Sequence, residues 1–160
     1  MKRDAVPRRR APDCAGRRFA IVSARFHTDL ADALVDGAQR ALRDCNVAEQ
    51  DVSLFEVPGC FELPLACRNI IAGGRFDALV ALGAVIRGET AHFDFVAGEC
   101  ARGIMDVSLA TGTPIGFGVL TTENLAQAQE RADPKRGDKG YAAAVAAATM
   151  LQEMSTIGRT

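Results

Sequence analysis

The chain has 160 residues, 48% of them hydrophobic, with 19 Lys and Arg against 20 Asp and Glu, which fits one globular domain with a substantial core. No apolar run is long enough to span a bilayer and the first residues lack the apolar stretch of a secretory signal, so we expect neither a membrane protein nor an exported one. The five cysteines include no Cys-x-x-Cys pair, which argues against a disulfide framework or a zinc knuckle and favours reduced thiols in a cytoplasmic protein.

Positive charge is concentrated at the start of the chain. Up to Arg18 there are seven Lys and Arg against two Asp, whereas the remainder has 12 basic and 18 acidic residues. Pro7 and Pro12 argue against a regular helix there. We therefore expect residues 1–17 to form a disordered, solvated arm and residues 18–160 to form a single domain. Contact with nucleic acid or another anionic surface, or an organellar targeting role, are the alternatives for the arm.

Four apolar runs follow, and each has the length of a β-strand: Phe19–Ala24, Val52–Val57, Ala78–Ile86 and Pro114–Leu120. The third run is apolar at both alternating sets of positions. That pattern is typical of a central parallel strand that is covered on both faces.

Helical patterns separate these runs. Apolar residues recur at the spacing of an amphipathic helix, and an Ala-rich segment closes the chain. We expect Asp29 and Thr122 to cap the first and fourth helices and Gly73 to end the second. The expected helical segments are Leu30–Leu42, Leu63–Ile71, Phe93–Val107, one that begins at Glu123, and Gly140–Met154. Strands and helices that alternate in this way predict a three-layer α/β sandwich with a parallel sheet.

The loops that follow the four runs are the places to look for a site, because ligands bind beyond the carboxyl ends of the strands in open parallel sheets. These loops are Arg25–His27, Pro58–Glu62, Ile86–His92 and Thr121–Asn124. Together they collect an aromatic ring, a carboxylate, a polar turn that contains glycine, and both histidines of the chain. We therefore predict a ligand site at this edge of the sheet.

The loop after the third run leads into a helix that we expect to start near Glu89 and Thr90. The free N–H groups and the dipole of a helix start favour phosphate, and Gly88 would let the backbone approach the anion. The stretch matches no nucleotide-binding fingerprint. His92, half a turn into the expected helix, can exchange a proton with a ligand held there. The alternatives are an ordinary capped helix and a surface histidine.

Three further features each have a functional and a structural interpretation. Phe26 either stacks on a flat heterocycle or plugs the core. Glu62 either accepts hydrogen bonds from a polyol or complements the dipole of the following helix. The basic loop Glu130–Gly140, with Arg131 and Lys139, is either a solvated surface or, folded over a neighbouring subunit's strand tips, part of an anion site.

Five blocks of the sequence, in this order, resemble the lumazine synthase family: ARF, VPGCFELP, LGAVIRGETAHFDFV, FGVLTTEN and ERA…KRGDKG. The resemblance runs from Arg18 to about Met154 and leaves out the basic arm. It implies a flavodoxin-like fold with a four-stranded parallel sheet and an enzyme of riboflavin biosynthesis. The implied reaction condenses 5-amino-6-(D-ribitylamino)uracil with 3,4-dihydroxy-2-butanone 4-phosphate to 6,7-dimethyl-8-ribityllumazine, phosphate and water. No metal or organic cofactor is implied.

The resemblance also implies a role for each matched position. His92 matches the residue that transfers protons, and the other matched positions are implied to bind substrate. The heterocycle would stack on Phe26 and be held by Ala84, Val85 and Ile86, and the ribityl chain would contact Cys60, Phe61 and Glu62. Phosphate would bind at Glu89 and Thr90 with Arg131 and the supporting Lys139, and Phe117 would come from the adjacent subunit.

A site shared between chains implies a ring. Relatives form homopentamers, some of which pack into an icosahedral shell, and the short basic loop favours the shell. Riboflavin synthase is the protein that such a shell would enclose. The alternatives to an enzyme are a carrier that binds flavin or lumazine, and a shell protein whose main role is that enclosure. His27, Cys60 and Ala84 depart from the family pattern, in which Asn, Ala and Thr are frequent at these positions.

Overall fold

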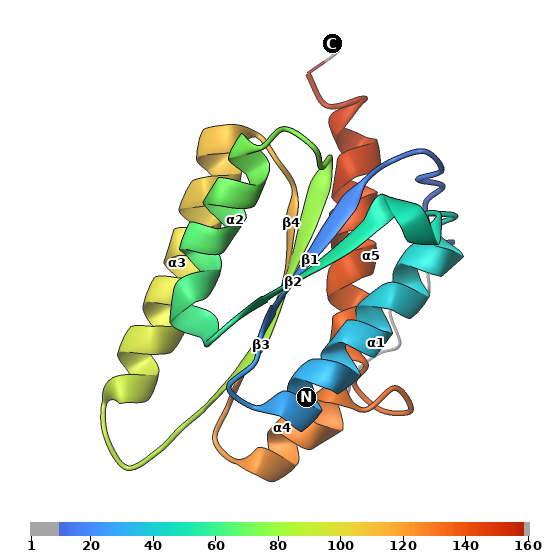
Figure 1. Ribbon diagram of the computed structural model, residues 1–160. Coiled ribbons are helices and arrows are strands. Elements are labelled where there is room, and N and C mark those ends of the chain that lie inside the picture. Colours follow the sequence, from blue (N-terminus) through green and yellow to red (C-terminus); the bar gives the residue numbers. More distant parts are fainter. Residues whose placement is uncertain (1–9, 159–160) are drawn as a thin grey trace.

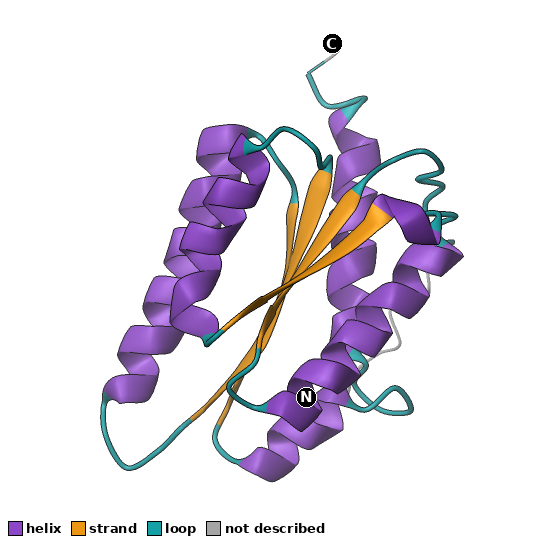
Figure 2. Cartoon of the chain, viewed as in Figure 1, coloured by secondary structure: helices purple, strands orange, loops and turns teal. Residues whose placement is uncertain are grey.

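The computed structural model describes residues 10–158, and Figure 1 shows how they are arranged. Four parallel strands form one sheet in the order β2-β1-β3-β4. Their bounds are β1 Phe19–Ala24, β2 Val52–Val57, β3 Ala78–Ile86 and β4 Ile115–Thr122. Figure 2 shows this sheet between two layers of helices. The predicted three-layer α/β sandwich with a four-stranded parallel sheet is confirmed.

The helices divide between the two faces of the sheet (Figure 1). One face is covered by α1 (Thr28–Asp44), α4 (Leu125–Ala132) and α5 (Lys139–Met154), and the other by α2 (Leu63–Ala72) and α3 (His92–Thr111). Two short 3₁₀ turns, η1 (Glu49–Asp51) and η2 (Cys60–Glu62), flank β2. No helix in residues 10–158 combines the length and the apolar character needed to cross a bilayer.

Strand β1 shows why the sheet needs both layers. Its side chains alternate between two apolar clusters: Phe19 and Ile21 point toward α1 and α5, and Ala20 and Val22 toward α2 and α3. All four side chains are fully buried. A strand that is apolar on both faces is stable only when helices cover both faces. The sheet core is therefore continuous from one helical layer to the other.

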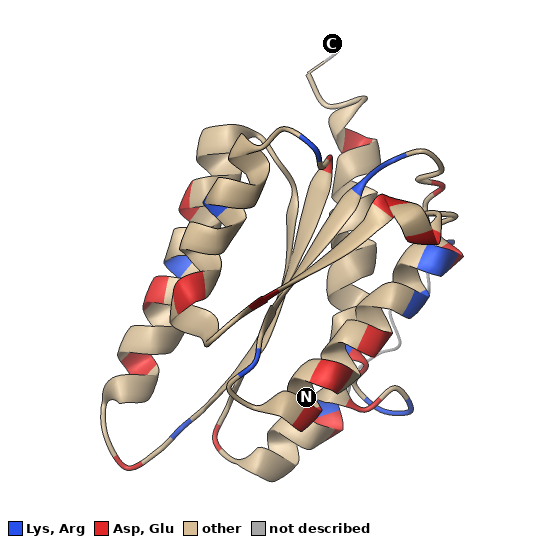
Figure 3. Ribbon diagram, in the orientation of Figure 1, with Lys and Arg blue, Asp and Glu red and all other residues tan. Residues whose placement is uncertain are grey.

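The start of α5 is fixed against α1. A Cβ atom at Gly140 would overlap the backbone of Leu34, so only glycine permits this close approach. Asp138, in the left-handed region at φ 46°, accepts two hydrogen bonds from the Arg40 guanidinium, at 3.1 and 2.8 Å. Figure 3 shows charged residues of both signs along α1 and in the loop that leads to α5. These contacts hold the α4–α5 loop within the protomer.

The chain before β1 already contacts the domain. Cys14 is buried; its N–H donates to the Cys45 carbonyl at 2.8 Å and its thiol donates to the Ala148 carbonyl at 3.7 Å. Packing therefore begins before the boundary that we predicted at Arg18. The rest of the predicted arm, residues 1–9, lies outside the described residues.

Both predicted helix caps are wrong by a short distance along the chain. Helix α1 is preceded by His27, so Asp29 lies in its first turn, where its charge complements the dipole. Strand β4 runs on to Thr122, and the cap of α4 is Asn124, whose side chain accepts a hydrogen bond from the Gln127 N–H at 2.9 Å. The Thr122 hydroxyl instead donates to the Asn124 carbonyl, at 3.0 Å.

Candidate functional site

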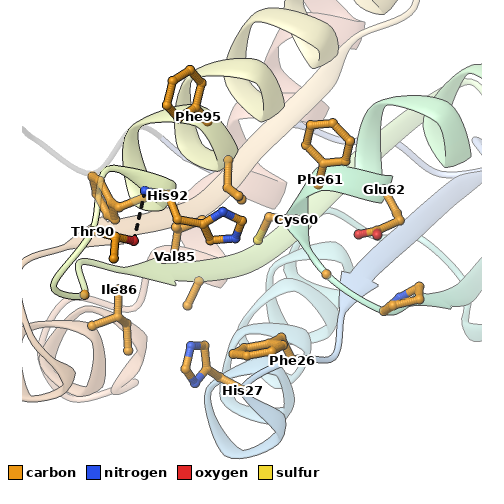
Figure 4. Close-up of a pocket in the computed structure, with 16 residues that line it drawn as sticks. Phe26, His27, Cys60, Phe61, Glu62, Val85, Ile86, Thr90, His92 and Phe95 are labelled. Atoms are coloured by element: carbon orange, nitrogen blue, oxygen red, sulfur yellow. Dashed lines mark hydrogen bonds between the residues drawn. The ribbon is translucent and has the colours of Figure 1, made fainter.

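A cavity of about 580 Å³ lies beyond the carboxyl ends of β1, β2 and β3, where the sequence predicts a ligand site. Figure 4 shows the side chains that surround it. Most of the predicted site residues line this cavity: Phe26, Cys60, Phe61, Glu62, Ala84, Val85, Ile86, Thr90 and His92. These residues come from the end of β3 and from the segments that follow β1, β2 and β3, which the parallel order of the strands brings together.

The aromatic wall of the cavity is Phe26, which follows β1. Its side chain is 78% exposed, so it is not a core plug. The only ring that it contacts in the described residues is His27, edge-on at 5.0 Å between centroids. Both faces of the Phe26 ring are thus available to a planar ligand, which an aromatic ring stacks against by an offset arrangement.

The η2 turn supplies the second wall. Cys60 is only 5% exposed and forms part of the floor, whereas Phe61 is exposed at the rim. Glu62 stands immediately before α2 but makes no hydrogen bond that caps it. In Figure 4 its carboxylate is drawn on the same side of the cavity as Phe61. A carboxylate that is not used by its own helix can accept hydrogen bonds from the hydroxyl groups of a ligand.

The third wall is the turn between β3 and α3. Helix α3 begins at His92, two to three residues later than predicted, because the residues from Arg87 to Ala91 stay in the turn. The Thr90 hydroxyl accepts a hydrogen bond from the His92 N–H at 3.3 Å, drawn as the dashed line in Figure 4. His92 is therefore the first residue of the helix. Its imidazole lies in the cavity beside the turn that we predicted would bind an anion.

Arg87 braces this turn, a role that the sequence analysis missed. Its guanidinium donates to Glu123 at 2.8 Å and to Asp94 at 3.3 Å, and it lies 4.3 Å from the centroid of the Phe93 ring. The two carboxylates raise the pKa of the Arg87 side chain, and the hydrogen bond that Arg87 donates to Glu123 is the largest cause. The signal available in the sequence was an arginine placed directly after a buried strand. Arg87 therefore links the end of β3 to the first turn of α3, through Asp94, and to the segment between β4 and α4, through Glu123.

Four predicted site residues do not line the cavity of the single protomer. Glu89 lies in the turn but does not line the cavity, and Phe117 is in the middle of β4, where it pairs with Ala81. Arg131 lies on α4 and donates to the Gln127 carbonyl at 3.1 Å, and Lys139 is the first residue of α5. The cavity of the protomer is therefore lined by the residues predicted for stacking, polyol binding and proton transfer, but not by the predicted basic groups.

The described residues contain no group of three or more His, Cys, Asp or Glu side chains that could hold a metal ion. The cavity itself has an apolar lining with a few polar groups, Glu62, Thr90 and His92 among them. This composition is typical of pockets that take small organic molecules.

Fold and cavity together define a flavodoxin-like α/β protein with a small-molecule site at its strand tips. A family model described as 6,7-dimethyl-8-ribityllumazine synthase matches residues 16–155. A 6,7-dimethyl-8-ribityllumazine synthase from Halorhodospira halophila is 48% identical over 137 residues, covering 86% of this chain and 88% of the relative. One from Nitratidesulfovibrio vulgaris is 43% identical over 145 residues, covering 91% of this chain and 93% of the relative.

The chain belongs to the 6,7-dimethyl-8-ribityllumazine synthase family. The family resemblance that the sequence blocks carry is therefore confirmed, and with it the assignment to riboflavin biosynthesis.

Proposed function

We propose that the cavity at the strand tips is the active site in which this riboflavin biosynthesis enzyme forms 6,7-dimethyl-8-ribityllumazine. The reaction of the family joins 5-amino-6-(D-ribitylamino)uracil to 3,4-dihydroxy-2-butanone 4-phosphate and releases phosphate and water. One observation carries the proposal: an unobstructed aromatic ring, a free carboxylate and a histidine at a helix start converge on one cavity.

The uracil substrate fits the side of the cavity formed by β1, β3 and η2. Its planar ring would stack on Phe26, against the Ala84–Ile86 segment at the end of β3. Its ribityl chain would run along Cys60 and Phe61 and present a hydroxyl to Glu62. The depth of Cys60 and the exposure of Phe61 give this wall an apolar floor and an open rim.

The phosphate of the second substrate fits the turn that precedes α3. This helix runs from His92 to Thr111, and the free N–H groups and the dipole at its start favour an anion. The Thr90 hydroxyl accepts a hydrogen bond from the first N–H of the helix and so stands at the helix start. In this proposal Glu89 contributes its backbone N–H, because its carboxylate would repel phosphate.

His92 is proposed to move protons during imine formation and phosphate elimination. It stands between the anion turn and the ring-stacking wall, which is where the reacting carbon atoms would meet. A positioned general acid–base contributes about 10² to 10⁴-fold. Holding the two substrates together contributes on the order of 7 kcal/mol or more. Most of the rate enhancement therefore comes from positioning, and loss of the imidazole slows turnover without abolishing it.

A ring of protomers would complete the site. Phe117 is 45% exposed on the edge strand β4, and several other large apolar side chains on α3 are exposed: Phe95, Met105 and Leu109. Exposed apolar patches of this kind mark interaction surfaces. In the proposed homopentamer, the neighbour's Phe117 closes the cavity and its Arg131 and Lys139 supply the missing positive charge.

The larger assembly, the location and the protein partner complete the proposal. The short loop between α4 and α5, residues 133–138, favours an icosahedral shell of pentamers over a free ring, with riboflavin synthase as the enclosed partner. The free cysteines support a cytoplasmic location. Light scattering on the purified protein distinguishes a pentamer from a shell by mass.

The function is tested by mixing the two substrates and following lumazine absorbance. Wild-type protein should form product, and His92→Ala should lower kcat by about 10²-fold or less while the protomers still assemble. The other histidine provides a comparison, because His27→Ala should raise KM for the uracil substrate and leave kcat nearly unchanged. Binding of the product without turnover would favour a carrier, and an unchanged rate for His92→Ala would remove that residue from the mechanism.

A further inference from the structure

Three of the five cysteines lie together beneath the cavity. Cys60, Cys67 and Cys100 are free thiols in the apolar cluster between the sheet and the α2–α3 layer. Cys67 and Cys100 are fully buried, whereas Cys60 is slightly exposed and lines the cavity. The proposed reaction uses none of these thiols. One of them is therefore open to small molecules that enter the site, and two are not.

The Cys60 sulfur sits against bare backbone. A Cβ atom at Gly83 would lie only 2.5 Å from it, so the sulfur occupies the space that a side chain on β3 would otherwise take. The backbone N–H of Ala84 donates a hydrogen bond to the same sulfur. Cys60 also opens η2, whose backbone leads directly into α2. A backbone hydrogen-bond donor favours a thiolate over a thiol.

Cys100 completes the pair from α3. Its thiol donates a hydrogen bond to Cys60, which is the main cause that lowers the pKa of Cys60, while burial and the nearby Glu62 carboxylate oppose the shift. The pKa of Cys100 is raised by the same hydrogen bond and by burial. Burial alone raises the pKa of Cys67 to about 12. Cys60 is therefore the thiol of the cluster that a molecule in the cavity can reach, and Cys100 is the thiol that is hydrogen-bonded to it.

We propose that Cys60 is an oxidation site in the floor of the cavity and that Cys100 is its resolving thiol. The oxidant is a small peroxide such as hydrogen peroxide. The Cys60 thiolate attacks one peroxide oxygen and breaks the O–O bond, which gives Cys60 sulfenic acid and hydroxide. The Cys100 sulfur then attacks the Cys60 sulfur, and the disulfide forms with loss of water. Two thiols are oxidised and one peroxide is reduced.

Oxidation would act on the enzyme through the wall that holds the ribityl chain. This consequence rests on the proposed function, whereas the oxidation itself does not. A Cys60–Cys100 disulfide ties η2 to α3 and takes the sulfur away from its position over Gly83. Either the sulfenic oxygen or the disulfide changes the floor on which the substrate lies. The oxidised enzyme should lose activity and regain it with dithiothreitol.

The test follows the thiols by mass spectrometry in the assembled, full-length protein. Wild-type protein is treated with hydrogen peroxide at increasing ratios, alkylated and digested. We expect a linked peptide that contains Cys60 and Cys100, and its reversal by dithiothreitol. Cys100→Ser should give a Cys60 adduct with the sulfenic acid reagent dimedone. Cys67→Ser is the matched control and should behave as wild type.

Three results would overturn the proposal. They are a Cys60 that reacts with peroxide no faster than Cys67, a disulfide that joins Cys67 instead, and an absence of dimedone adduct in Cys100→Ser. The wild-type peptide map decides the question even where Cys100→Ser fails to fold. The proposed function fails separately, if the fully reduced enzyme forms no lumazine. A reduced enzyme that is active, and that stays fully active when the Cys60–Cys100 link is present, would refute the inhibitory consequence alone.

Discussion

Replacing Gly83 with alanine should destabilise the protein through the floor of the cavity. The new Cβ would lie 2.5 Å from the Cys60 sulfur and 2.9 Å from the Ala24 Cβ, about 0.9 and 0.5 Å inside the ordinary contact limit of 3.4 Å. Overpacking of this kind costs about 1–3 kcal/mol. The reduced freedom of the unfolded chain returns about 0.4–1 kcal/mol. We therefore expect Gly83→Ala to lower the free energy of unfolding by about 1–2 kcal/mol.

A double-mutant cycle identifies the sulfur as the cause. Cys60→Ala removes it, so Gly83→Ala in that background should retain only the smaller overlap with Ala24 and cost at least about 1 kcal/mol less. The assay is urea unfolding at one fixed protein concentration, because assembly couples to stability. Gly88→Ala is the control in the same cavity, since a Cβ there meets nothing within 4 Å. Additivity of the two changes within about 0.5 kcal/mol would refute the packing argument.

Three further outcomes can be measured. Asn124→Ala removes the hydrogen-bonded cap of α4 and should cost about 1 kcal/mol of stability, seen as a lower Tm. Asp138→Asn keeps a residue that tolerates the left-handed backbone but weakens the double hydrogen bond from Arg40, so urea unfolding should show a loss of about 1 kcal/mol. The pKa of Cys60 is lowered, whereas burial raises the pKa of Cys45 to about 11. Because the thiolate is the reactive form, iodoacetamide should alkylate Cys60 at a lower pH than Cys45. Alkylation in the reverse order would contradict this prediction.

The strands were predictable because their signal is local and strong. Every residue of Phe19–Ala24 is apolar or small, and each one is buried. The run Ala78–Ile86 is apolar at successive positions, which only a strand covered on both faces requires. Parallel order then follows from the helices between the runs, and the position of the cavity follows from parallel order.

The predicted cap of α4 was wrong because two nearby polar residues could each cap the helix. Thr122 and Asn124 are both good caps, and the sequence does not show that β4 extends through Thr122. The start of α3 shifted for a related reason. The turn before His92 is held by Arg87 through partners that are distant in sequence, and no local pattern reports such contacts.

The residues that we propose to act in a neighbouring protomer were assigned mainly through family resemblance. Phe117 and Arg131 lie on β4 and α4 and contact nothing in the cavity of their own protomer. Composition and spacing cannot show that a residue acts in another copy of the chain. The exposed apolar side chains on α3 are what supports the proposed ring, and their exposure is known only once the helix is placed on the sheet.

The close seating of α5 on α1 has a consequence for how the enzyme becomes active. Because Gly140 packs against Leu34 and Asp138 is hydrogen-bonded to Arg40, the segment that carries Lys139 is held in place within the single protomer. Association of protomers into the proposed ring would then lose no conformational entropy by ordering this segment. If the ring that we propose is required for activity, dilution should lower activity in step with the population of rings, without a slower phase for loop rearrangement.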